Sequence, residues 1–344
     1  MIIDKNLLQW LDNFQKESNY IYSSSIKDGY WSNLSKKENA NLMNMLKNHS
    51  TRECIKATHP QHKDVIFSAK RSVALELLQL SGSENAVDLG CMWGALTIPL
   101  AKQVNSVLGI DQTIESLKFS EARAVEDNLD NVRFLCGNLR NTVLPKEVFD
   151  VAVVNGVLEW IPEIEPVVVN DYWYGANARK ANGSPGKMQK DFLENVHQGL
   201  KTDGRLMLAI ENRYDYKMFF GERDPHAGIL FTSIMPRRIA NLISKTFKRR
   251  EYRPWIYSFN GIQTLLKETG FSSVSLYAVW PDYRTPEYIR PYGNHDPYWK
   301  PISARKANGK LGFRRVIANR IEWLLFSVFN LQFFAPSIIA IAKK

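Results

Sequence analysis

Residues 87–94 read Val87-Asp88-Leu89-Gly90-Cys91-Met92-Trp93-Gly94, an apolar run that leads into two glycines. The apolar run predicts a buried strand, and residues 95–102 are typical of a helix. Glycines let the backbone approach a ligand closely, and the first turn of a helix offers N–H groups without partners. The stretch therefore predicts a ligand-binding strand–turn–helix unit of an α/β fold.

An acidic residue, Asp111, follows Gly90 by 21 residues and ends the next apolar run. An acid at this place can accept hydrogen bonds from both hydroxyls of a ribose. Nicotinamide dinucleotides contain such a ribose, but their G-x-G-x-x-G pattern would require glycines at positions 92 and 95. This chain has Met92 and Ala95 instead. A nicotinamide oxidoreductase is therefore only the third-ranked interpretation.

Short apolar runs bounded by turn residues alternate with helical stretches from residue 86 onward. This alternation is typical of βαβ units around a parallel sheet. We predict an α/β fold with a seven-stranded, mostly parallel, doubly wound (Rossmann-like) sheet. The predicted strands are Ala86–Leu89, Ser106–Ile110, Val132–Cys136, Phe149–Val154, Arg205–Ile210, Val274–Val279 and Ile338–Ala342.

The chain is predicted to have two parts. Residues 1–62 form an N-terminal helical extension or cap, because apolar residues recur at helical spacing between Leu7 and Phe14. Residues 63–344 form the main domain, which begins with a helix from about Lys63 to Leu80. Three insertions interrupt this domain, at about 162–187, 212–255 and 281–335. Long insertions in a compact domain are usually functional, so we expect lids or walls around the site.

Further motif-like segments follow residues 87–94 along the chain. They are GID at 109–111, FLCGN at 134–138, FDVAVVNGVLEW at 149–160 and LKTDGRL at 200–206. Their order and spacing resemble those of class I methyltransferases over roughly residues 66–211. The resemblance implies the methyltransferase sheet and S-adenosylmethionine (S-adenosyl-L-methionine) as the cofactor.

The resemblance also assigns the cofactor-binding residues. The methionine end is expected to lie against Asp88 and the turn with Gly90, Cys91 and Gly94. Asp111, with Gln112 beside it, would bind the ribose, and Asn138, with Leu139 beside it, would bind the adenine. Asn155 would line the methyl-transfer cleft. Met92 stands where the family often has glycine, and Asn138 where it often has aspartate. A non-catalytic scaffold of the same fold is the alternative that these two departures support.

Candidate catalytic residues follow the fifth predicted strand. His226 is a candidate general base because its ordinary pKa lies near neutrality, and Glu211 ends a strand at the usual ligand edge of such sheets. The alternative is structural: Glu211 would form an ion pair with Arg213 or another cation, and His226 would cap a loop. A metal held by Glu211, Asp224 and His226 has no supporting ligand spacing, so no metal is predicted.

The acceptor is suggested by a second, less specific resemblance. Residues 210–214, 224–228 and 280–287 are similar to bacterial methyltransferases from gene clusters for surface polysaccharides. This similarity implies a hydroxyl of a sugar, nucleotide sugar or lipid-linked glycan. Trp and Tyr in the insertions fit sugar rings, although the same aromatics can simply pack the core or a lid.

Charge is unevenly distributed. Of a net +10, residues 237–344 contain 19 Lys and Arg against 6 Asp and Glu, whereas the rest is slightly acidic. This asymmetry indicates an anionic acceptor or partner, or else a basic solvated face. An RNA methyltransferase is the second-ranked enzyme, and a methyltransferase of another small molecule is the further alternative. Against RNA as the acceptor, no RNA-binding module is evident, and the basic residues are mixed with aromatics.

The remaining features concern location. Cys54, Cys91 and Cys136 show no disulfide or zinc pattern, and residues 1–5 show no signal peptide, so we predict a cytoplasmic protein. The apolar stretch 321–342 is interrupted by polar residues and Pro336. We therefore expect an amphipathic helix to about Leu331 and then a strand, with peripheral membrane contact left open and no transmembrane span.

Overall fold

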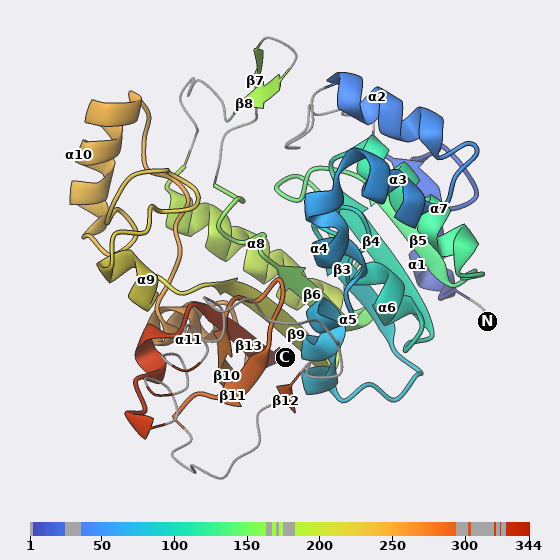
Figure 1. The fold of residues 1–344 in the computed structure, drawn as a ribbon. Helices are drawn as coiled ribbons and strands as arrows, with labels where there is room; N and C mark the ends of the chain where they lie inside the picture. The colour runs from blue at the N-terminus through green and yellow to red at the C-terminus, as the bar shows by residue number, and fades with distance from the viewer. Residues whose placement is uncertain are drawn as a thin grey trace.

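The computed structural model describes residues 3–24, 36–162, 167–169, 172–174, 183–293, 302–303, 320, 324 and 328–344. One large sheet runs through the molecule, with helices on both sides (Figure 1). Its parallel centre has the order β5-β4-β3-β6-β9. These strands are β3 (Asn85–Leu89), β4 (Ser106–Asp111), β5 (Val132–Cys136), β6 (Phe149–Asn155) and β9 (Leu200–Glu211).

Two further strands complete the predicted set of seven. β13 (Ser337–Lys343) lies antiparallel between β9 and β10 (Ser273–Trp280). All seven predicted strands are therefore present. The carboxyl end of β10 lies at the same sheet edge as the carboxyl ends of the central strands, because two successive antiparallel pairings restore the direction.

The predicted number of seven strands is wrong, because the described residues alone give the sheet eleven strands. β1 (Gln15–Lys16) and β2 (Ile21–Ser23) form a hairpin whose second strand pairs in parallel with β5. β11 (Tyr288–Pro291) and β12 (Ile302–Ser303) extend the opposite edge. These edge strands have two to four residues each, too few for a period-two pattern to distinguish them from loop. The segment 1–62 is thus only partly helical.

Both faces of the sheet are buried, which explains why its central strands are apolar runs. Along β6, Ala152 and Val154 face one hydrophobic core, while Val151 and Val153 face the other. The first core includes side chains of α1 (Lys5–Leu11), α8 (Pro185–Gly199) and α11 (Phe259–Glu268). The second includes α6 (Thr97–Ala101), α7 (Ile114–Glu126) and the 3-10 helix η2 (Val73–Leu78). The sheet is thus doubly wound, as predicted.

The segment between residues 36 and 80 consists of short helices. The helix predicted from Lys63 to Leu80 is broken, because Ser68 has an extended backbone with ψ 134°. Glu53 and Ser50 form a reciprocal capping box at the start of α3. The helices here are α2 (Lys36–Met45), α3 (Thr51–Thr58), η1 (Pro60–His62), α4 (Lys63–Phe67), α5 (Ala69–Ser72) and then η2.

Each predicted insertion contains structured parts. The first contains the hairpin β7 (Val167–Val169) and β8 (Tyr172–Tyr174), and the second contains α9 (Tyr216–Phe219) and α10 (Arg237–Lys248). The third contains β11, β12 and η4 (Gln332–Phe334). Most of the amphipathic helix expected before Leu331 lies outside the described residues. Among the described helices, none is long and apolar enough to cross a membrane.

Candidate active site

The predicted site residues come together at one edge of the sheet. Gly90 follows β3, Asp111 ends β4, Asn138 follows β5, Asn155 ends β6 and Glu211 ends β9. These five strands are neighbours in the order β5-β4-β3-β6-β9 and all point the same way. Ligands of open α/β sheets bind at the carboxyl ends of the strands, where the chain reverses its order. The chain adds β4 and β5 on one side of β3 and then β6 and β9 on the other side, so the strand order reverses between β3 and β6. Gly90 follows β3 and Asn155 ends β6, so both lie at this point.

The glycine turn has the backbone that its sequence demands. Gly90 and Gly94 have φ values of 81° and 67°, the left-handed region in which glycine is at ease. A Cβ on Gly90 would lie 2.4 Å from a methyl group of Val157, so the position also has no room for a side chain. The amides of Gly90 and Cys91 donate to the carbonyl of Ile110, at 2.8 and 3.1 Å. The turn is thereby fixed to the end of β4.

Met92 takes the same left-handed conformation without being glycine. Its φ is 42°, and its N–H donates to Asp111 Oδ2 at 2.9 Å. The other oxygen of Asp111 accepts from the amide of Thr113 at 2.9 Å. Asp111 is buried, yet a carboxylate has about four acceptor sites, so each oxygen retains capacity for a ribose hydroxyl.

Asp88 lies beneath the turn, where it is almost fully buried. Thr97 Oγ1 donates to its Oδ2 at 2.6 Å, which ties the start of α6 to β3. Burial raises the pKa of Asp88 to about 6. The hydrogen bond from Thr97 and the charge of Arg71 act in the opposite direction and lower the pKa, but burial is the larger effect. Burial also raises the pKa of the neighbouring Cys91 thiol, which is therefore a neutral wall of the site. Asp88 supports the turn from below.

The predicted adenine contacts occupy the turn after β5. Asn138 is buried, and its Oδ1 accepts from the amide of Arg140 at 3.0 Å. Leu139 is half-buried against the core that contains α8. Gln112 follows β4, and its carbonyl accepts from Cys136 Sγ at 3.6 Å. Asn155 differs from these residues because its buried Oδ1 has no hydrogen-bond partner.

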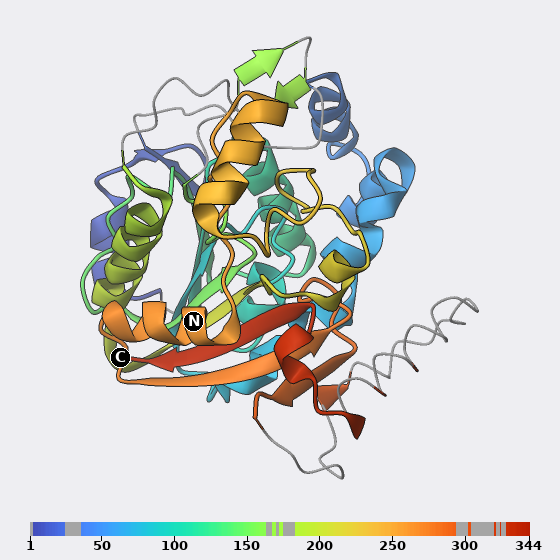
Figure 2. The same cartoon turned by 90° about the vertical axis from the view of Figure 1, so that its left-hand side faces the viewer.

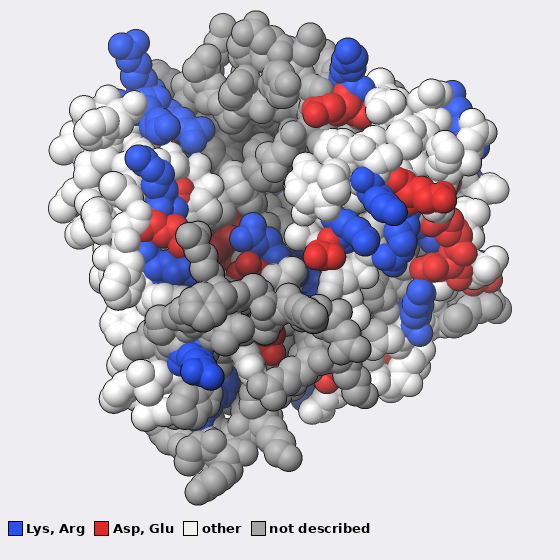
Figure 3. All heavy atoms as spheres, viewed as in Figure 1, with Lys and Arg blue, Asp and Glu red and all other residues white. Residues whose placement is uncertain are grey.

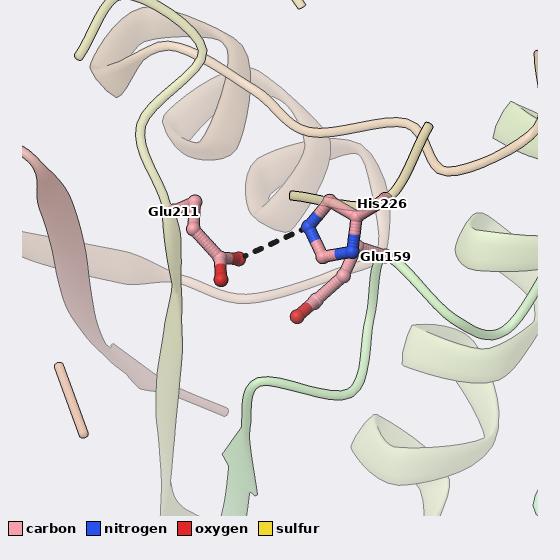
Figure 4. Close-up of side chains that lie close together, drawn as sticks. All are labelled: Glu159, Glu211 and His226. Carbon is pink, nitrogen blue, oxygen red and sulfur yellow. Dashed lines mark ion pairs between the residues drawn. The ribbon is translucent and has the colours of Figure 1, made fainter. Parts of the chain in front are cut away.

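The two predicted catalytic residues meet at the end of β9. His226, from the loop between α9 and α10, places Nε2 3.5 Å from Glu211 Oε2. Glu159, from the turn after β6, completes a group of three (Figure 4), and one ligand-type atom from each residue lies within 4.8 Å of the others. Glu159 is fully buried, and the His226 side chain is only 3% exposed. Their polar atoms therefore face one another rather than solvent.

The charges of this group are strongly coupled. Burial and the nearby Glu211 carboxylate raise the pKa of Glu159 well above its usual range. Burial alone would lower the pKa of His226, but Glu211 outweighs it and raises that pKa to about 9. Burial would raise the pKa of Glu211, but the His226 charge outweighs it and lowers that pKa. At neutral pH the group thus contains a protonated Glu159 beside a Glu211 carboxylate and a His226 imidazolium.

Aromatic side chains surround the group. Tyr283 donates its hydroxyl to Glu211 Oε1 at 3.2 Å. Its ring occupies the space beside Gly156, where a Cβ would lie 2.3 Å from the Tyr283 oxygen. The ring of Trp160 packs edge-on against His226, with centroids 4.6 Å apart. The walls of the group are therefore aromatic.

Two structural alternatives can be compared with these contacts. Arg213 donates to the carbonyls of Ser233 and Met235. Glu211 forms an ion pair with the imidazole of His226, which is a cation other than Arg213 of the kind that this alternative allowed. Asp224 accepts from the amide of His226 at 2.8 Å and from the Tyr252 hydroxyl at 2.8 Å, so its carboxylate shapes the loop.

Sequence reasoning did not single out Glu159 and Tyr283. Glu159 lies four residues after Asn155, the last residue of β6, and Tyr283 lies three residues after Trp280, the last residue of β10. Both strands end at the same sheet edge as β9, which was the available signal. An acid or a tyrosine shortly after a strand is common, however, and only the folded turns bring these two to Glu211.

Part of the chain matches a known protein family. Residues 80–224 match the family model described as a methyltransferase domain. The chain is similar to the 23S rRNA (uracil(1939)-C(5))-methyltransferase RlmD of Pasteurella multocida, with 39% identity over 66 residues, or 19% of this chain and 15% of that protein. The Aliivibrio salmonicida protein of the same name is 31% identical over 107 residues, 28% of this chain and 24% of the relative. The matches thus span less than a quarter of these relatives.

Solved structures give a similar result. One is a SAM-dependent methyltransferase of Thermotoga maritima, described as a possible histamine N-methyltransferase, with 12% identity, a TM-score of 0.43, and 86% of this chain and 98% of that chain covered. Another is a SAM-dependent methyltransferase of Archaeoglobus fulgidus, with 14% identity, a TM-score of 0.43, and coverage of 83% and 98%. From the family match, residues 80–224 are a methyltransferase domain whose cofactor is S-adenosylmethionine, as the sequence predicts.

Proposed function

We propose that the protein transfers a methyl group from S-adenosylmethionine to a hydroxyl of a sugar, a nucleotide sugar or a lipid-linked glycan. The observation that carries this proposal is the buried pair of Glu211 and His226 at the sheet edge that also carries the glycine turn. A hydroxyl acceptor must lose its proton on methylation, and a carboxylate paired with an imidazole is suited to that task.

The methyl donor, S-adenosylmethionine, needs no chemical activation by the protein. The sulfonium methyl is already electrophilic, so the protein mainly aligns the acceptor oxygen with it. A C–O bond forms, the C–S bond breaks, and the cofactor leaves as neutral S-adenosylhomocysteine. Because His226 is protonated in the resting pair, Glu211 is the member that can accept a hydrogen bond from the hydroxyl at once. His226 keeps Glu211 ionised.

The surroundings of the pair support a glycan-related acceptor. Tyr283 and Trp160 flank Glu211 and His226 with aromatic rings, which pack well on the faces of sugars. The similarity to surface-polysaccharide methyltransferases involves the same segments, residues 210–214, 224–228 and 280–287. Basic residues from 237 onward would suit the phosphates of a nucleotide sugar or a lipid carrier.

RNA is the second candidate acceptor. It is favoured by the short matches to rRNA methyltransferases and by the same excess of Lys and Arg. A glycan is preferred because Tyr283 and Trp160, which flank Glu211 and His226, offer ring faces of the kind that pack on sugars.

We also propose a cytoplasmic location. Within the part of the chain that the structure describes, Cys54, Cys91 and Cys136 form no disulfide, and two of them are buried. Free thiols are typical of a reducing compartment.

Two measurements on the full-length protein test the function. Calorimetry with S-adenosylhomocysteine tests cofactor binding. Transfer of a labelled methyl group from S-adenosylmethionine tests the acceptor, offered as nucleotide sugars, lipid-linked glycans or ribosomal RNA. Asp203→Asn, at an exposed carboxylate on β9, serves as the matched control for substitutions of Glu211.

We expect cofactor binding in the wild type, in Glu211→Gln and in the control. Label should enter a glycan-type acceptor, and Glu211→Gln should lose roughly 100-fold or more in rate, as loss of a proton acceptor does. Label in RNA alone would select the second candidate. If S-adenosylhomocysteine did not bind, the enzyme proposal would give way to the scaffold.

A further inference from the structure

We propose that Glu159, Glu211 and His226 bind a single divalent metal ion that presents the acceptor hydroxyl to the methyl donor. This inference rests on the proposed function for its chemistry, but the site itself rests on geometry. Three elements far apart in sequence bring the three side chains together: the turn after β6, the end of β9 and the loop before α10. Figure 4 shows them directed toward one another.

Missing hydrogen bonds are the independent observation that points to a ligand. Both carboxylate oxygens of Glu159 and both ring nitrogens of His226 are buried without hydrogen-bond partners. Oε2 of Glu211 is also buried without a hydrogen-bond partner, and its one polar contact is the ion pair with His226 Nε2. Buried polar atoms are almost always satisfied, so a set of atoms without partners that faces one point suits a ligand that contacts all of them. A divalent cation would satisfy an atom of each residue at once.

The separations suit a metal after a small contraction. Ligands about 2.1 Å from a metal lie about 3.4 Å apart in tetrahedral geometry and about 3.0 Å apart in octahedral geometry. His226 Nε2 and Glu211 Oε2 are already 3.5 Å apart. The group as a whole lies within 4.8 Å, so a contraction of at most about 1.4–1.8 Å would bring its atoms to metal-binding separations. Rotation of the Glu159 side chain can supply that contraction.

The buried charges also favour a cation. Two carboxylates share this interior space, and burial makes an uncompensated charge on either of them costly. Tyr283 and Trp160 pack against the group. In such surroundings a divalent ion balances both carboxylates, whereas the imidazolium of His226 balances only one.

The ligand set indicates the class of metal and its use. One imidazole and two carboxylates suit first-row ions such as Mn²⁺ or Zn²⁺ better than the all-oxygen sites of Ca²⁺. Three protein ligands leave coordination positions open, as in catalytic sites. An acceptor hydroxyl bound there would become more acidic, its proton would pass to a carboxylate oxygen of Glu211 that the metal leaves free, and its oxygen would then attack the methyl group. Glu211 would thus keep the role of proton acceptor that the proposed function gives it, with His226 as a ligand.

Binding of Mn²⁺ alone tests the site without any assay of activity. Chelator-treated protein is titrated with Mn²⁺ and followed by electron paramagnetic resonance, beside Glu159→Gln, His226→Ala and the control Asp203→Asn. We expect one saturable site in the wild type and in the control. Each ligand substitution should weaken it more than about 100-fold, because even outer-shell substitutions cost about 10–100-fold. Binding of S-adenosylhomocysteine shows that each variant is folded.

The outcomes separate the metal proposal from the proposed function. Saturable S-adenosylhomocysteine binding without a site for Mn²⁺, or for Zn²⁺ in a parallel titration, would overturn the metal site and leave the methyltransferase intact. Equal Mn²⁺ binding by Glu159→Gln and the wild type would do the same. Mn²⁺ binding without cofactor binding would support the site and refute the proposed function.

A separate observation concerns the surface of α10. Its buried positions are the small residues Ala240 and Ser244. Three of its four large apolar residues instead face solvent, with Ile239 at 48%, Leu242 at 67% and Phe247 at 74% exposure, whereas Ile243 is half-buried. Figure 2 shows α10, in light orange, standing outside the layers of the sheet and its helices. A helix normally buries its large apolar residues, so this one presents them to a partner.

Cations surround these apolar residues. Arg238, Lys245, Lys248 and Arg249 are exposed on or next to α10, and Figure 3 shows basic side chains on this side of the molecule. We infer that α10 lies on an anionic lipid surface, with its apolar side chains in the bilayer boundary and its cations at the headgroups. A second copy of this helix would bring like charges together. RNA would leave Ile239, Leu242 and Phe247 without contacts.

Sedimentation with lipid vesicles tests this surface. The full-length protein is mixed with vesicles of phosphatidylcholine, with or without phosphatidylserine, and compared with Leu242→Asp and Phe247→Asp. Val143→Asp is the matched control, because Val143 is 72% exposed elsewhere. We expect salt-sensitive sedimentation only with phosphatidylserine, retained by Val143→Asp and lost by the α10 variants. Binding to RNA but not to vesicles, or equal sedimentation of all variants, would overturn the inference.

Discussion

Met92 donates its backbone N–H to Asp111 Oδ2 at 2.9 Å while holding a φ of 42°. A residue with a side chain thus occupies a left-handed position in the middle of the cofactor turn. The contact also joins the turn after β3 to the acid at the end of β4. The departure from the family's usual glycine therefore preserves the backbone of the turn, which argues against a lost pocket.

Substitution of Met92 should reveal the strain at this position. A β-branched residue tolerates positive φ poorly, so Met92→Ile should lower the free energy of unfolding by about 1–3 kcal/mol. Met92→Gly suits the same φ and should be less destabilising than Met92→Ile. Urea unfolding of the three proteins measures the difference. Equal stabilities for the two variants would show that backbone conformation is not the cause.

Removal of the Asp111 carboxylate should impair cofactor binding. Asp111→Ala loses the acceptor for Met92 N–H and the proposed ribose contact. A hydrogen bond to a charged group contributes about 1.5–3 kcal/mol, so the dissociation constant should rise by roughly 10–100-fold or more. Calorimetry with S-adenosylhomocysteine measures it, with Asp203→Asn as control. An unchanged dissociation constant would place the ribose elsewhere.

Asp88 should make stability depend on pH. Its pKa is about 6 in the folded protein against an ordinary 3.8, so folding favours the protonated form. The contribution is present in full below pH 3.8 and is lost as the pH rises through about 6. At 1.36 kcal/mol per pKa unit, the loss is about 3 kcal/mol. Asp88→Asn should remove this decline when unfolding is measured at pH 4 and pH 7, and a parallel decline in both proteins would assign it to other groups.

Tyr283 should position Glu211 rather than react. Tyr283→Phe keeps the ring beside Gly156 but loses the hydroxyl that donates to Glu211 Oε1. We expect roughly a tenfold lower kcat, with binding of S-adenosylhomocysteine unchanged, because one hydrogen bond of about 1.5 kcal/mol is lost. Steady-state kinetics separate kcat from KM. A change in KM alone would make Tyr283 a contact of the acceptor instead.

The sequence predicts the central part of this fold well. Runs such as Phe149–Val154 are apolar on both faces, because cores lie on both sides of the sheet, so their signal is strong. The sequence named Glu211 and His226 separately as candidates, and only the fold shows that they form a pair. The protonation state of His226 could not be predicted from the sequence, because the neighbouring Glu211 carboxylate raises its pKa to about 9.

Other features depend on contacts that no local pattern encodes. Ser68 breaks the predicted helix after Lys63 with an extended backbone, although nothing in its neighbourhood is a strong helix breaker. β2 is only three residues long and exists because β5 offers it an edge. Glu159 becomes part of the buried group only through its contact with Glu211, which lies 52 positions further along the chain. Each of these required the folded molecule.

The position of β13 has a consequence for how the protein is made. β9 and β10 do not pair with each other, because β13 lies between them, with Ser337 opposite Glu211. During synthesis, a chain grown as far as residue 336 holds two unpaired strand edges, which are templates for wrong association. β13, the strand whose Ser337 lies opposite Glu211, follows every other strand of the sheet in the sequence and therefore joins the sheet after them. The carboxylate on which the proposed chemistry depends is therefore among the last groups that the nascent chain can fix.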